Sequence, residues 1–382
     1  MKQKVIIIGG GAAGFFTAIT AAEKNSDLEV IILEKSDKVL QKVKVSGGGR
    51  CNVTHACFTP IELIEFYPRG KKELLGPFHQ FMTGDTMEWF EKRGVPLKIE
   101  EDNRVFPESN SSQTIINCFT ESAKNANVKV IFNQNVESIL KVGEQFKVTT
   151  NSREFISDKL VITTGSNPKI WKLISKLGHN IINPVPSLFT FKIDDNRIKE
   201  IPGVSVPNAT VSLIDTKFKT TGPLLITHWG LSGPAILKIS AFGALFLAEK
   251  NYKFCVSINW LSKPFSTVLR ELKDLKKLNS KKQISLKSPY EEIPKRLWEK
   301  LVVASQIKPE QRWADLSNKQ LENLANHLTN SVFNANGKTT FKEEFVTAGG
   351  VDLKEINFKR FESKIHKNLF FAGEVLNIDA IT

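Results

Sequence analysis

The first residues of the chain carry a pattern that constrains the fold more than any other. Residues 4–14 read KVIIIGGGAAG, an apolar run that breaks into glycines, and an apolar helix pattern follows at once over residues 15–22. Gly9, Gly11 and Gly14 stand at the G-x-G-x-x-G spacing. In this pattern the first glycine permits a tight turn, the second lets the pyrophosphate approach the backbone, and the third lets the helix pack closely on the strand. The pattern predicts a dinucleotide site at a helix N-terminus, where free N–H groups meet phosphate.

A second strand with an acid at its end follows the glycine loop. Residues 28–33 read LEVIIL and lead into Glu34, whose carboxylate can accept hydrogen bonds from ribose hydroxyls. We place Glu34 and Lys35 in the nucleotide site, together with Ala12 and Ala13 of the loop. The alternative, a glycine-rich turn between ordinary elements, leaves Glu34 unexplained.

The composition is that of a globular protein with more than one domain. A chain of 382 residues predicts two or three domains, and 41% hydrophobic and 24% charged residues are ordinary values. No stretch reaches the roughly 18 apolar residues that span a bilayer. The apolar run at residues 5–8 is too short for a signal peptide. We therefore predict a cytoplasmic protein with no membrane partner.

Cysteines and histidines exclude several kinds of chemistry. No C-x-x-C pair occurs, which predicts free thiols and argues against a flavin–disulfide reductase. For Cys51 we favour a packing role over that of a nucleophile, because no activating histidine stands at a fixed spacing. The histidines are scattered, so we predict no metal site. These residues are Cys51, Cys57, Cys118 and Cys255, and His55, His79, His179, His228, His327 and His366.

The chain carries a net charge of +13, and residues 263–296 hold ten basic against four acidic residues. A nucleic-acid surface would interleave aromatic residues with these charges, but only Phe265 and Tyr290 lie there. We expect a solvated helical surface rather than a nucleic-acid partner.

Strand and helix patterns alternate along the chain in blocks. Four strand-like stretches within residues 128–164 predict a β-meander whose last strand re-enters the core sheet, and the prolines at residues 183–186 predict the exit from the first domain. Residues 188–261 predict a β-rich domain with one helix, capped by Ser232 and with Pro234 in its first turn. Helical spacing over residues 264–333 predicts three or four helices.

Four segments together resemble one known family. They are SGGGRCN at 46–52, GPLLITHWGLSGPAIL at 222–237, VTAGGV at 346–351 and NLFFAGEVLNIDAIT at 368–382. The chain resembles the bacterial family of NAD(P)/FAD-dependent oxidoreductases that includes aminoacetone oxidase and a flavoprotein of bile-acid dehydroxylation. The resemblance implies non-covalent FAD in an α/β Rossmann-type domain split in sequence, residues 1–186 and 335–382. A β-rich substrate domain, residues 187–262, and a helical subdomain, residues 263–334, are inserted.

The resemblance also implies roles for single residues. Gly373 and Glu374 match the pair at a strand end near the ribityl chain, and Val136 matches a position that offers backbone groups to adenine. A further set matches the loop beside the cofactor: Gly47, Gly48, Gly49, Arg50 and Asn52.

Part of this assignment is physical as well. Consecutive glycines expose N–H groups and accept conformations closed to other residues, and Arg50 can neutralise pyrophosphate. The alternative is a mobile surface loop with a solvated arginine. Gly165, which follows the last strand of the meander, allows a further close approach to the backbone.

His228 is the acid/base candidate, because it precedes a predicted helix start and histidine titrates near neutral pH. A structural histidine bonded to backbone is an equal alternative. For Trp229 we favour a buried core position over a place in a substrate pocket. No second glycine fingerprint follows a strand, so NAD(P)H would dock transiently on the flavin, or oxygen would be the oxidant.

Together these features predict an FAD-dependent oxidoreductase that moves a hydride between flavin and a small organic substrate, with NAD(P)H as a candidate donor. The alternatives are an amine or aminoketone oxidase that uses oxygen, and a non-catalytic FAD-binding protein with a basic, RNA-associated surface. The oligomeric state is left open. Family members continue beyond the last motif with a closing helix, so we expect a chain ending at Thr382 to be a fragment with weakened FAD binding.

Overall fold

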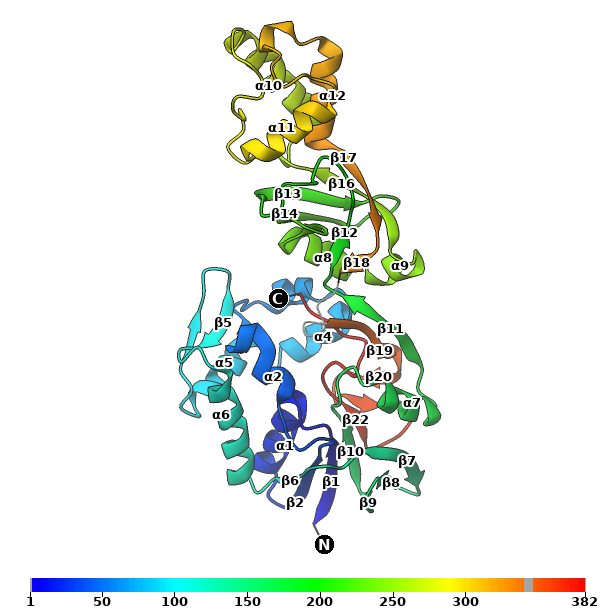
Figure 1. Ribbon diagram of the computed structural model, residues 1–382. Coiled ribbons are helices and arrows are strands. Elements are labelled where there is room, and N and C mark those ends of the chain that lie inside the picture. The colour runs from blue at the N-terminus through cyan, green and yellow to red at the C-terminus, as the bar shows by residue number, and fades with distance from the viewer. Residues whose placement is uncertain (1, 340–345, 382) are drawn as a thin grey trace. The chain divides into compact units, whose positions relative to one another are not determined.

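The computed structural model describes residues 2–339 and 346–381 (Figure 1). Contacts divide the chain into two compact units. The first unit comprises Met1–Pro184 and Val346–Thr382, and the second comprises Val185–Phe345. The first unit is therefore discontinuous in sequence.

A seven-stranded sheet forms the centre of the first unit, in the order β20-β21-β22-β10-β1-β2-β6. Its strands are β1 (Gln3–Ile8), β2 (Leu28–Leu33), β6 (Lys129–Ile131), β10 (Lys159–Ile162), β20 (Ile356–Asn357), β21 (Glu362–Ser363) and β22 (Leu369–Phe371). The five strands from β22 to β6 are parallel. This order is that of a Rossmann-type sheet and confirms the predicted fold class.

Both faces of this sheet are buried, as a parallel sheet requires. Val5 and Ile7 of β1 pack on one face with α1 (Ala12–Lys24) and α6 (Ser112–Asn125), whereas Ile6 and Ile8 join a core on the other face. That second core includes α7 (Pro168–Lys176) and the small antiparallel sheet of β7 (Val136–Val142), β8 (Gln145–Thr150) and β9 (Glu154–Ser157).

The predicted meander is correct only in part. Its first stretch forms β6, which pairs in parallel with β2 and belongs to the main sheet. The prediction lacks the strand β9, because this strand has only four residues, EFIS, and no alternating pattern of apolar and polar residues. The last stretch enters the main sheet as β10, as predicted.

Residues 41–107 form an excursion from the sheet that contains short helices and a three-stranded sheet in the order β3-β5-β4. Its elements are α2 (Gln41–Val45), a 3₁₀ turn (Ser46–Gly49), β3 (Thr54–His55), α3 (Pro60–Leu63), a second 3₁₀ turn (Ile64–Phe66), α4 (Lys71–Phe78), α5 (Thr83–Glu91), β4 (Leu97–Ile99) and β5 (Arg104–Pro107).

The segment with the prolines at residues 183–186 is itself a strand. β11 (Ile181–Ser187) pairs with β19 (Val346–Val351) in a two-stranded sheet. Proline is tolerated there because a strand with one neighbour needs only part of its N–H groups. Gly349 of β19 has a φ of +114°, and a Cβ on it would lie 2.7 Å from the Cα of Pro184, so the close approach requires glycine.

The second unit is built on an antiparallel sheet in the order β17-β16-β13-β14-β15-β12-β18. Its strands are β12 (Thr190–Lys192), β13 (Ser205–Leu213), β14 (Lys219–Thr227), β15 (Gly230–Ser232), β16 (Lys253–Asn259), β17 (Ser331–Asn336) and β18 (Lys338–Thr339). Because β17 pairs with β16 along its whole length, residues 331–336 belong to this sheet.

The helix predicted after β15 begins differently from the prediction. α8 (Pro234–Phe242) has Gly233 as its N-cap, with a φ of +91°, and a Cβ on Gly233 would lie 2.9 Å from the Leu225 nitrogen. The Ser232 hydroxyl instead bonds to Thr190 at 2.9 Å, so Ser232 is not the cap. A short helix α9 (Ala244–Glu249) follows.

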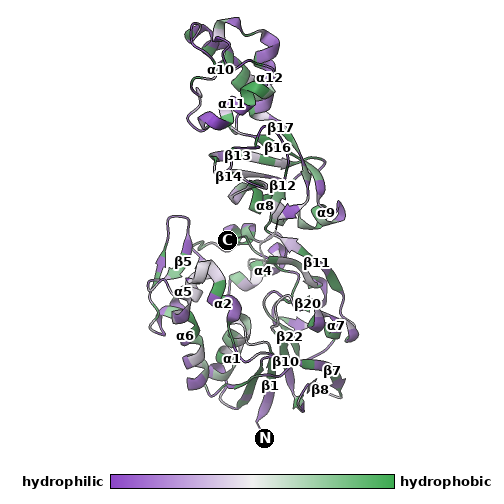
Figure 2. Ribbon diagram, in the orientation of Figure 1, coloured by the Kyte–Doolittle hydropathy of each residue, from purple (hydrophilic) through white to green (hydrophobic). Residues whose placement is uncertain are grey.

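Three α-helices complete the second unit: α10 (Phe265–Leu278), α11 (Lys295–Ala304) and α12 (Asn318–Thr329), with a 3₁₀ turn at Trp313–Asp315. Figure 2 shows mixed hydrophilic and hydrophobic turns on them, as expected for helices with one buried face. Their buried residues, such as Trp298 and Leu321, join Trp260 and Phe333 of the sheet in one core. Sheet and helices thus form one compact unit.

Candidate functional site

The glycine loop joins β1 to α1 and shows why each glycine is needed. Gly9 has a φ of +111°, and a Cβ on it would lie 2.7 Å from the Thr163 carbonyl oxygen; a Cβ on Gly14 would lie 2.0 Å from the Gly9 oxygen. A Cβ on Gly11 would meet no atom of the described residues within 4 Å. Gly9 and Gly14 are therefore required by packing, whereas Gly11 faces open space at the helix N-terminus.

The first turn of α1 follows directly and contains Ala12 and Ala13. Backbone N–H groups at a helix start lack intrahelical partners, and the helix dipole favours a negative charge there. The Thr163 hydroxyl donates to the carbonyl oxygens of Ile8 and Gly9, at 2.9 Å each, and so holds the loop. The loop is therefore held in a conformation that can accept a phosphate group.

Glu34 is fixed at the end of β2. One carboxylate oxygen accepts from the Gly10 nitrogen at 2.8 Å, and the other accepts from the nitrogen and hydroxyl of Ser36 at 3.0 and 2.9 Å. The oxygen that accepts from Gly10 retains a further lone pair. Glu34 thus both ties the glycine loop to β2 and can receive ribose hydroxyls.

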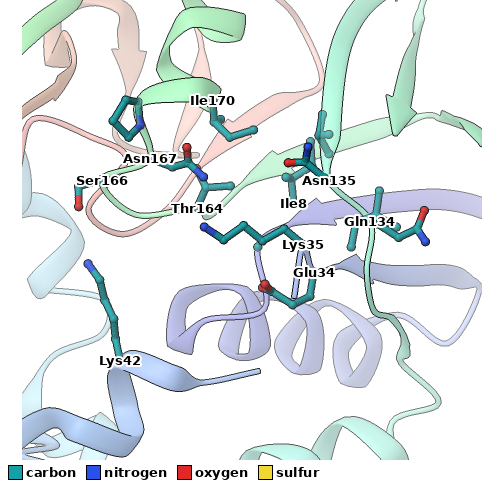
Figure 3. Close-up of a pocket in the computed structure, with 14 residues that line it drawn as sticks. Ile8, Glu34, Lys35, Lys42, Gln134, Asn135, Thr164, Ser166, Asn167 and Ile170 are labelled. Atoms are coloured by element: carbon teal, nitrogen blue, oxygen red, sulfur yellow. The ribbon is translucent and has the colours of Figure 1, made fainter. Parts of the chain in front are cut away.

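A pocket of about 260 Å³ opens at the carboxyl ends of the parallel strands (Figure 3). It is lined by Ile8, Gly9, Leu33, Glu34, Lys35, Lys42, Gln134, Asn135, Val136, Thr164, Ser166, Asn167, Pro168 and Ile170. Figure 3 shows Glu34 and Lys35 after β2, and Thr164, Ser166 and Asn167 after β10. This edge is where open α/β sheets bind ligands, and four of the predicted residues line it: Gly9, Glu34, Lys35 and Val136.

One buried polar atom in this pocket fits a ligand. The Thr164 hydroxyl oxygen is buried and has no hydrogen-bond partner within residues 2–339 and 346–381. Buried hydroxyls are normally satisfied. Together with the space at Gly11 this atom shows that the residues present fit a dinucleotide.

The last strand of the chain returns to the same place. Gly373 follows β22 with a φ of +79°, and a Cβ on it would lie 3.0 Å from the Cβ of Ala13. Glu374 accepts from the Lys42 ammonium at 2.8 Å, and a Cβ on Gly165 would lie 3.7 Å from both charged groups. The structure therefore brings Gly165, Gly373 and Glu374 to the N-terminus of α1.

The loop at residues 47–52 has the expected backbone, but its arginine is directed elsewhere. Gly47, Gly48 and Gly49 have φ values of +57°, +68° and +85°. Arg50 donates to Glu100 at 2.6 Å and lies over the Phe106 ring at 3.9 Å. Arg50 is thus held against the β4–β5 hairpin, and its predicted role at the pyrophosphate stays a prediction.

The other two residues of this loop lie close to the same hairpin. Cys51 is buried with a φ of +64°, and burial raises the pKa of its thiol, which suits the packing role. The Asn52 side-chain amide lies beside Val105, and Asn52 lines a separate hollow of about 250 Å³ with His55 and Tyr67.

His228 lies in the second unit, in the exposed turn between β14 and β15. It lines a pocket of about 500 Å³ with Trp229 and Lys192. Trp229 is 56% exposed, so the prediction of a buried core tryptophan is wrong. Trp229 lies at the tip of an exposed turn, so its side chain is not packed among the apolar residues of the adjacent strands.

Several pocket residues carry no role in the sequence-based prediction. Asn167 caps α7 by accepting from the Lys169 nitrogen at 3.0 Å, and the Asn-Pro pair after a buried strand is a recognisable helix start at a ligand-binding edge. No local sequence pattern marks Lys42 as a pocket residue, because it belongs to the short helix α2, whose position depends on the tertiary fold.

The strand order, the glycine cradle and the returning strand define a Rossmann-type flavoprotein oxidoreductase. The chain belongs to the family described as "HI0933-like protein Rossmann domain", whose model matches residues 3–382. Membership of this FAD-binding family implies FAD as the cofactor and confirms that the chain is an enzyme.

Three relatives extend over nearly the whole chain. A ribosomal RNA dihydrouridine synthase of Escherichia coli is 30% identical over 386 residues, covering 98% of this chain and 91% of the relative. The synthase of the same name from Haemophilus influenzae is 27% identical, covering 98% and 92%. A 3-dehydro-bile acid delta(4,6)-reductase of Clostridium scindens is 25% identical, covering 99% and 94%.

A solved structure shares the fold. The 3-ketosteroid-delta4-(5alpha)-dehydrogenase of Rhodococcus jostii has a TM-score of 0.50 and 12% identity, covering 98% of this chain and 91% of its own. Among the described residues, no helix is both long and apolar enough to span a bilayer, and no group of three or more His, Cys, Asp or Glu residues could hold a metal ion.

Proposed function

We propose that this enzyme reduces the C5–C6 double bond of a uracil base in ribosomal RNA, with a reduced nicotinamide as the source of electrons. The observation that carries this proposal is the pair of ribosomal RNA dihydrouridine synthases, which align over 98% of the chain. This proposal replaces the expectation of a small organic substrate and of no nucleic-acid partner.

The charge distribution supports an RNA substrate. The second unit holds 24 Lys and Arg against 15 Asp and Glu, whereas the rest of the chain holds 29 against 25. The second unit thus carries +9 of the net +13. A concentrated positive charge attracts a polyanion and speeds its association.

The residues of the first unit would bind and orient FAD. The glycine loop and the N-terminus of α1 would bind the pyrophosphate, Glu34 the ribose, and the pocket beside Val136 the adenine. When bound, FAD supplies hydride chemistry. Saturating the C5–C6 bond also requires a proton, and we assign His228 as the candidate donor to the base carbon C5.

The direct test is to incubate purified enzyme with FAD, NADPH or NADH, and ribosomal RNA from cells in which the gene is deleted. We expect nucleosides that have gained two hydrogens, detected by mass spectrometry after digestion. The matched control is Gly11→Asp, which places a carboxylate where the pyrophosphate binds. Flavin that is reduced by nicotinamide while the RNA stays unmodified would contradict the proposal.

A second candidate is a reductase of a small unsaturated ketone, favoured by the bile-acid reductase that aligns over 99% of the chain. Anaerobic mixing of the flavin-loaded enzyme with single donors separates the classes. Bleaching by NADH or NADPH supports either reductase, and bleaching only by an amine supports the oxidase alternative. No bleaching by NADH or NADPH would contradict both reductases.

A further inference from the structure

The pocket around Trp229 has features that the proposed reaction does not use. Trp229 is 56% exposed at the tip of the β14–β15 turn. An exposed aromatic ring does not gain the free energy of burial in the folded protein. An exposed tryptophan beside a hollow therefore marks a contact site. The hollow has a volume of about 500 Å³, within the usual range for ligand pockets.

The turn that carries Trp229 is rigid. The Trp229 carbonyl oxygen accepts from the Ile193 nitrogen at 2.9 Å, and its nitrogen donates to the Thr227 hydroxyl at 3.3 Å. Gly230 has a φ of +142°, and a Cβ on it would lie 2.3 Å from the Phe191 carbonyl oxygen. These contacts therefore fix the backbone that carries the indole, while the ring itself is exposed.

The charges around the pocket leave a positive surplus. Of the two carboxylates that line it, Asp194 pairs with Lys199 at 3.5 Å and Glu200 pairs with Lys300 of α11 at 3.0 Å. Lys192 also lines the pocket and has no carboxylate at ion-pair distance within the described part of the chain. Arg296 of α11 donates to the Glu200 carbonyl oxygen at 2.7 Å and adds a further positive charge.

An exposed aromatic ring flanked by lysines has the chemistry that binds single-stranded nucleic acid, where bases stack and cations meet phosphates. We propose that this pocket binds an unpaired nucleotide of the RNA substrate, with the base stacked on Trp229 and a neighbouring phosphate at Lys192 and Lys199. The identity of the partner rests on the proposed function, in which His228 of the same pocket is the candidate proton donor.

The test titrates a fluorescein-labelled single-stranded oligouridine of about twelve nucleotides, within the usual site size, into the FAD-loaded full chain and follows anisotropy. Trp229→Ala should weaken binding about 5- to 150-fold, the range for one stacked base. Trp229→Phe should restore most of the affinity, because phenylalanine keeps a stacking face. The double variant Lys192→Ala, Lys199→Ala should reduce the dependence of affinity on salt.

Two matched controls lie in the same unit. Phe265 is 43% exposed at the start of α10, and Lys217 is exposed in the turn before β14, whereas Trp229 lies in the turn after that strand. Phe265→Ala and Lys217→Ala should bind RNA as the unchanged protein does. Equal losses in Phe265→Ala and Trp229→Ala would overturn the proposal, as would an unchanged affinity in a correctly folded Trp229→Ala. If Trp229→Ala fails to fold, the other two variants test the proposal. The double variant Lys192→Ala, Lys199→Ala should reduce the salt dependence of binding, and Trp229→Phe should keep most of the affinity.

A parallel assay of dihydrouridine separates this inference from the proposed function. Dihydrouridine formed with an unchanged KM for RNA in Trp229→Ala would refute the stacking site and leave the function intact. RNA binding that depends on Trp229 without any dihydrouridine would refute the function and leave the site intact. Displacement of the oligouridine by 4-androstene-3,17-dione, in a way that depends on Trp229, would assign the pocket to a small apolar ligand and overturn the proposal.

Discussion

The pocket of the first unit that we propose for the flavin, which we call the flavin pocket, differs from the Trp229 pocket of the second unit in the parts of the chain that form it. The flavin pocket depends on backbone: a Cβ on Gly14 would lie 2.0 Å from another backbone atom, and strand ends supply most of its lining. The Trp229 pocket depends on side chains at a turn tip, with a ring that is 56% exposed. A site made by backbone leaves glycines at fixed spacing in the sequence, whereas a site made by exposed side chains leaves no such pattern.

The largest expected effect separates two glycines of the same loop. Gly14→Ala forces a methyl group against the Gly9 oxygen, so we expect a loss of stability of more than about 3 kcal/mol and no retained FAD. Gly11→Ala meets no described atom within 4 Å, so it should fold normally and lose only FAD affinity. Thermal unfolding and flavin content measure both. Equal melting temperatures in the two variants would show that the loop yields and that backbone packing does not define this pocket.

The next effect concerns the second unit. His228→Ala should lower kcat by about 100-fold if the imidazole donates the proton in turnover, while FAD content and reduction of the flavin by nicotinamide stay normal. Stopped-flow reduction and steady-state turnover are measured on the same preparation. A variant that loses folding along with turnover would assign His228 a structural role instead.

Glu34→Ala should weaken FAD binding by about 1.5 to 3 kcal/mol, the range for a hydrogen bond to a charged group. The variant also removes the acceptors of Gly10 and Ser36. Glu34→Gln keeps the size of the side chain and one acceptor oxygen, so it serves as the matched control and should lose less. FAD is titrated into the apoprotein and followed by its fluorescence. Unchanged affinity in Glu34→Ala would remove the residue from the ribose site.

The smallest effect compares the two units through one histidine in each, the buried His179 and the half-buried His327. Burial lowers the pKa of His179, although the Glu355 carboxylate at 2.8 Å acts in the opposite direction, and burial likewise lowers the pKa of His327. The unfolded chain then takes up protons more readily than the folded chain, near the ordinary histidine value of about 6.5. Stability is therefore complete above that pH and falls as the pH decreases below it.

Urea unfolding between about pH 5 and pH 7.5 checks this expectation. His179→Gln should flatten the pH dependence of the first unit and His327→Gln that of the second. Identical slopes in both variants and the unchanged protein would show that neither histidine is the group that titrates.

Much of the first unit could be predicted because its constraints are local. The run at residues 4–14 and Glu34 lie within one β-α-β unit, so spacing alone indicates the turn, the helix start and the acid. Arg50 shows the limit. Its position after three glycines suggests pyrophosphate, but its partner Glu100 lies fifty residues away, on a hairpin whose approach no local pattern reveals.

The sequence by itself determined the Rossmann-type class, because glycines that must admit a backbone or a phosphate cannot be replaced by other residues. The split of the first unit and the FAD cofactor followed from the resemblance of four sequence segments to a known family. Only the tertiary structure decided which side chains share a pocket. Lys42 donates a hydrogen bond to Glu374, which lies 332 positions further along the chain. Trp229 is exposed in a turn that a backbone hydrogen bond from Ile193, just beyond β12, holds in place. Contacts of that kind depend on chain paths that close over long distances, and no periodicity in the sequence records them.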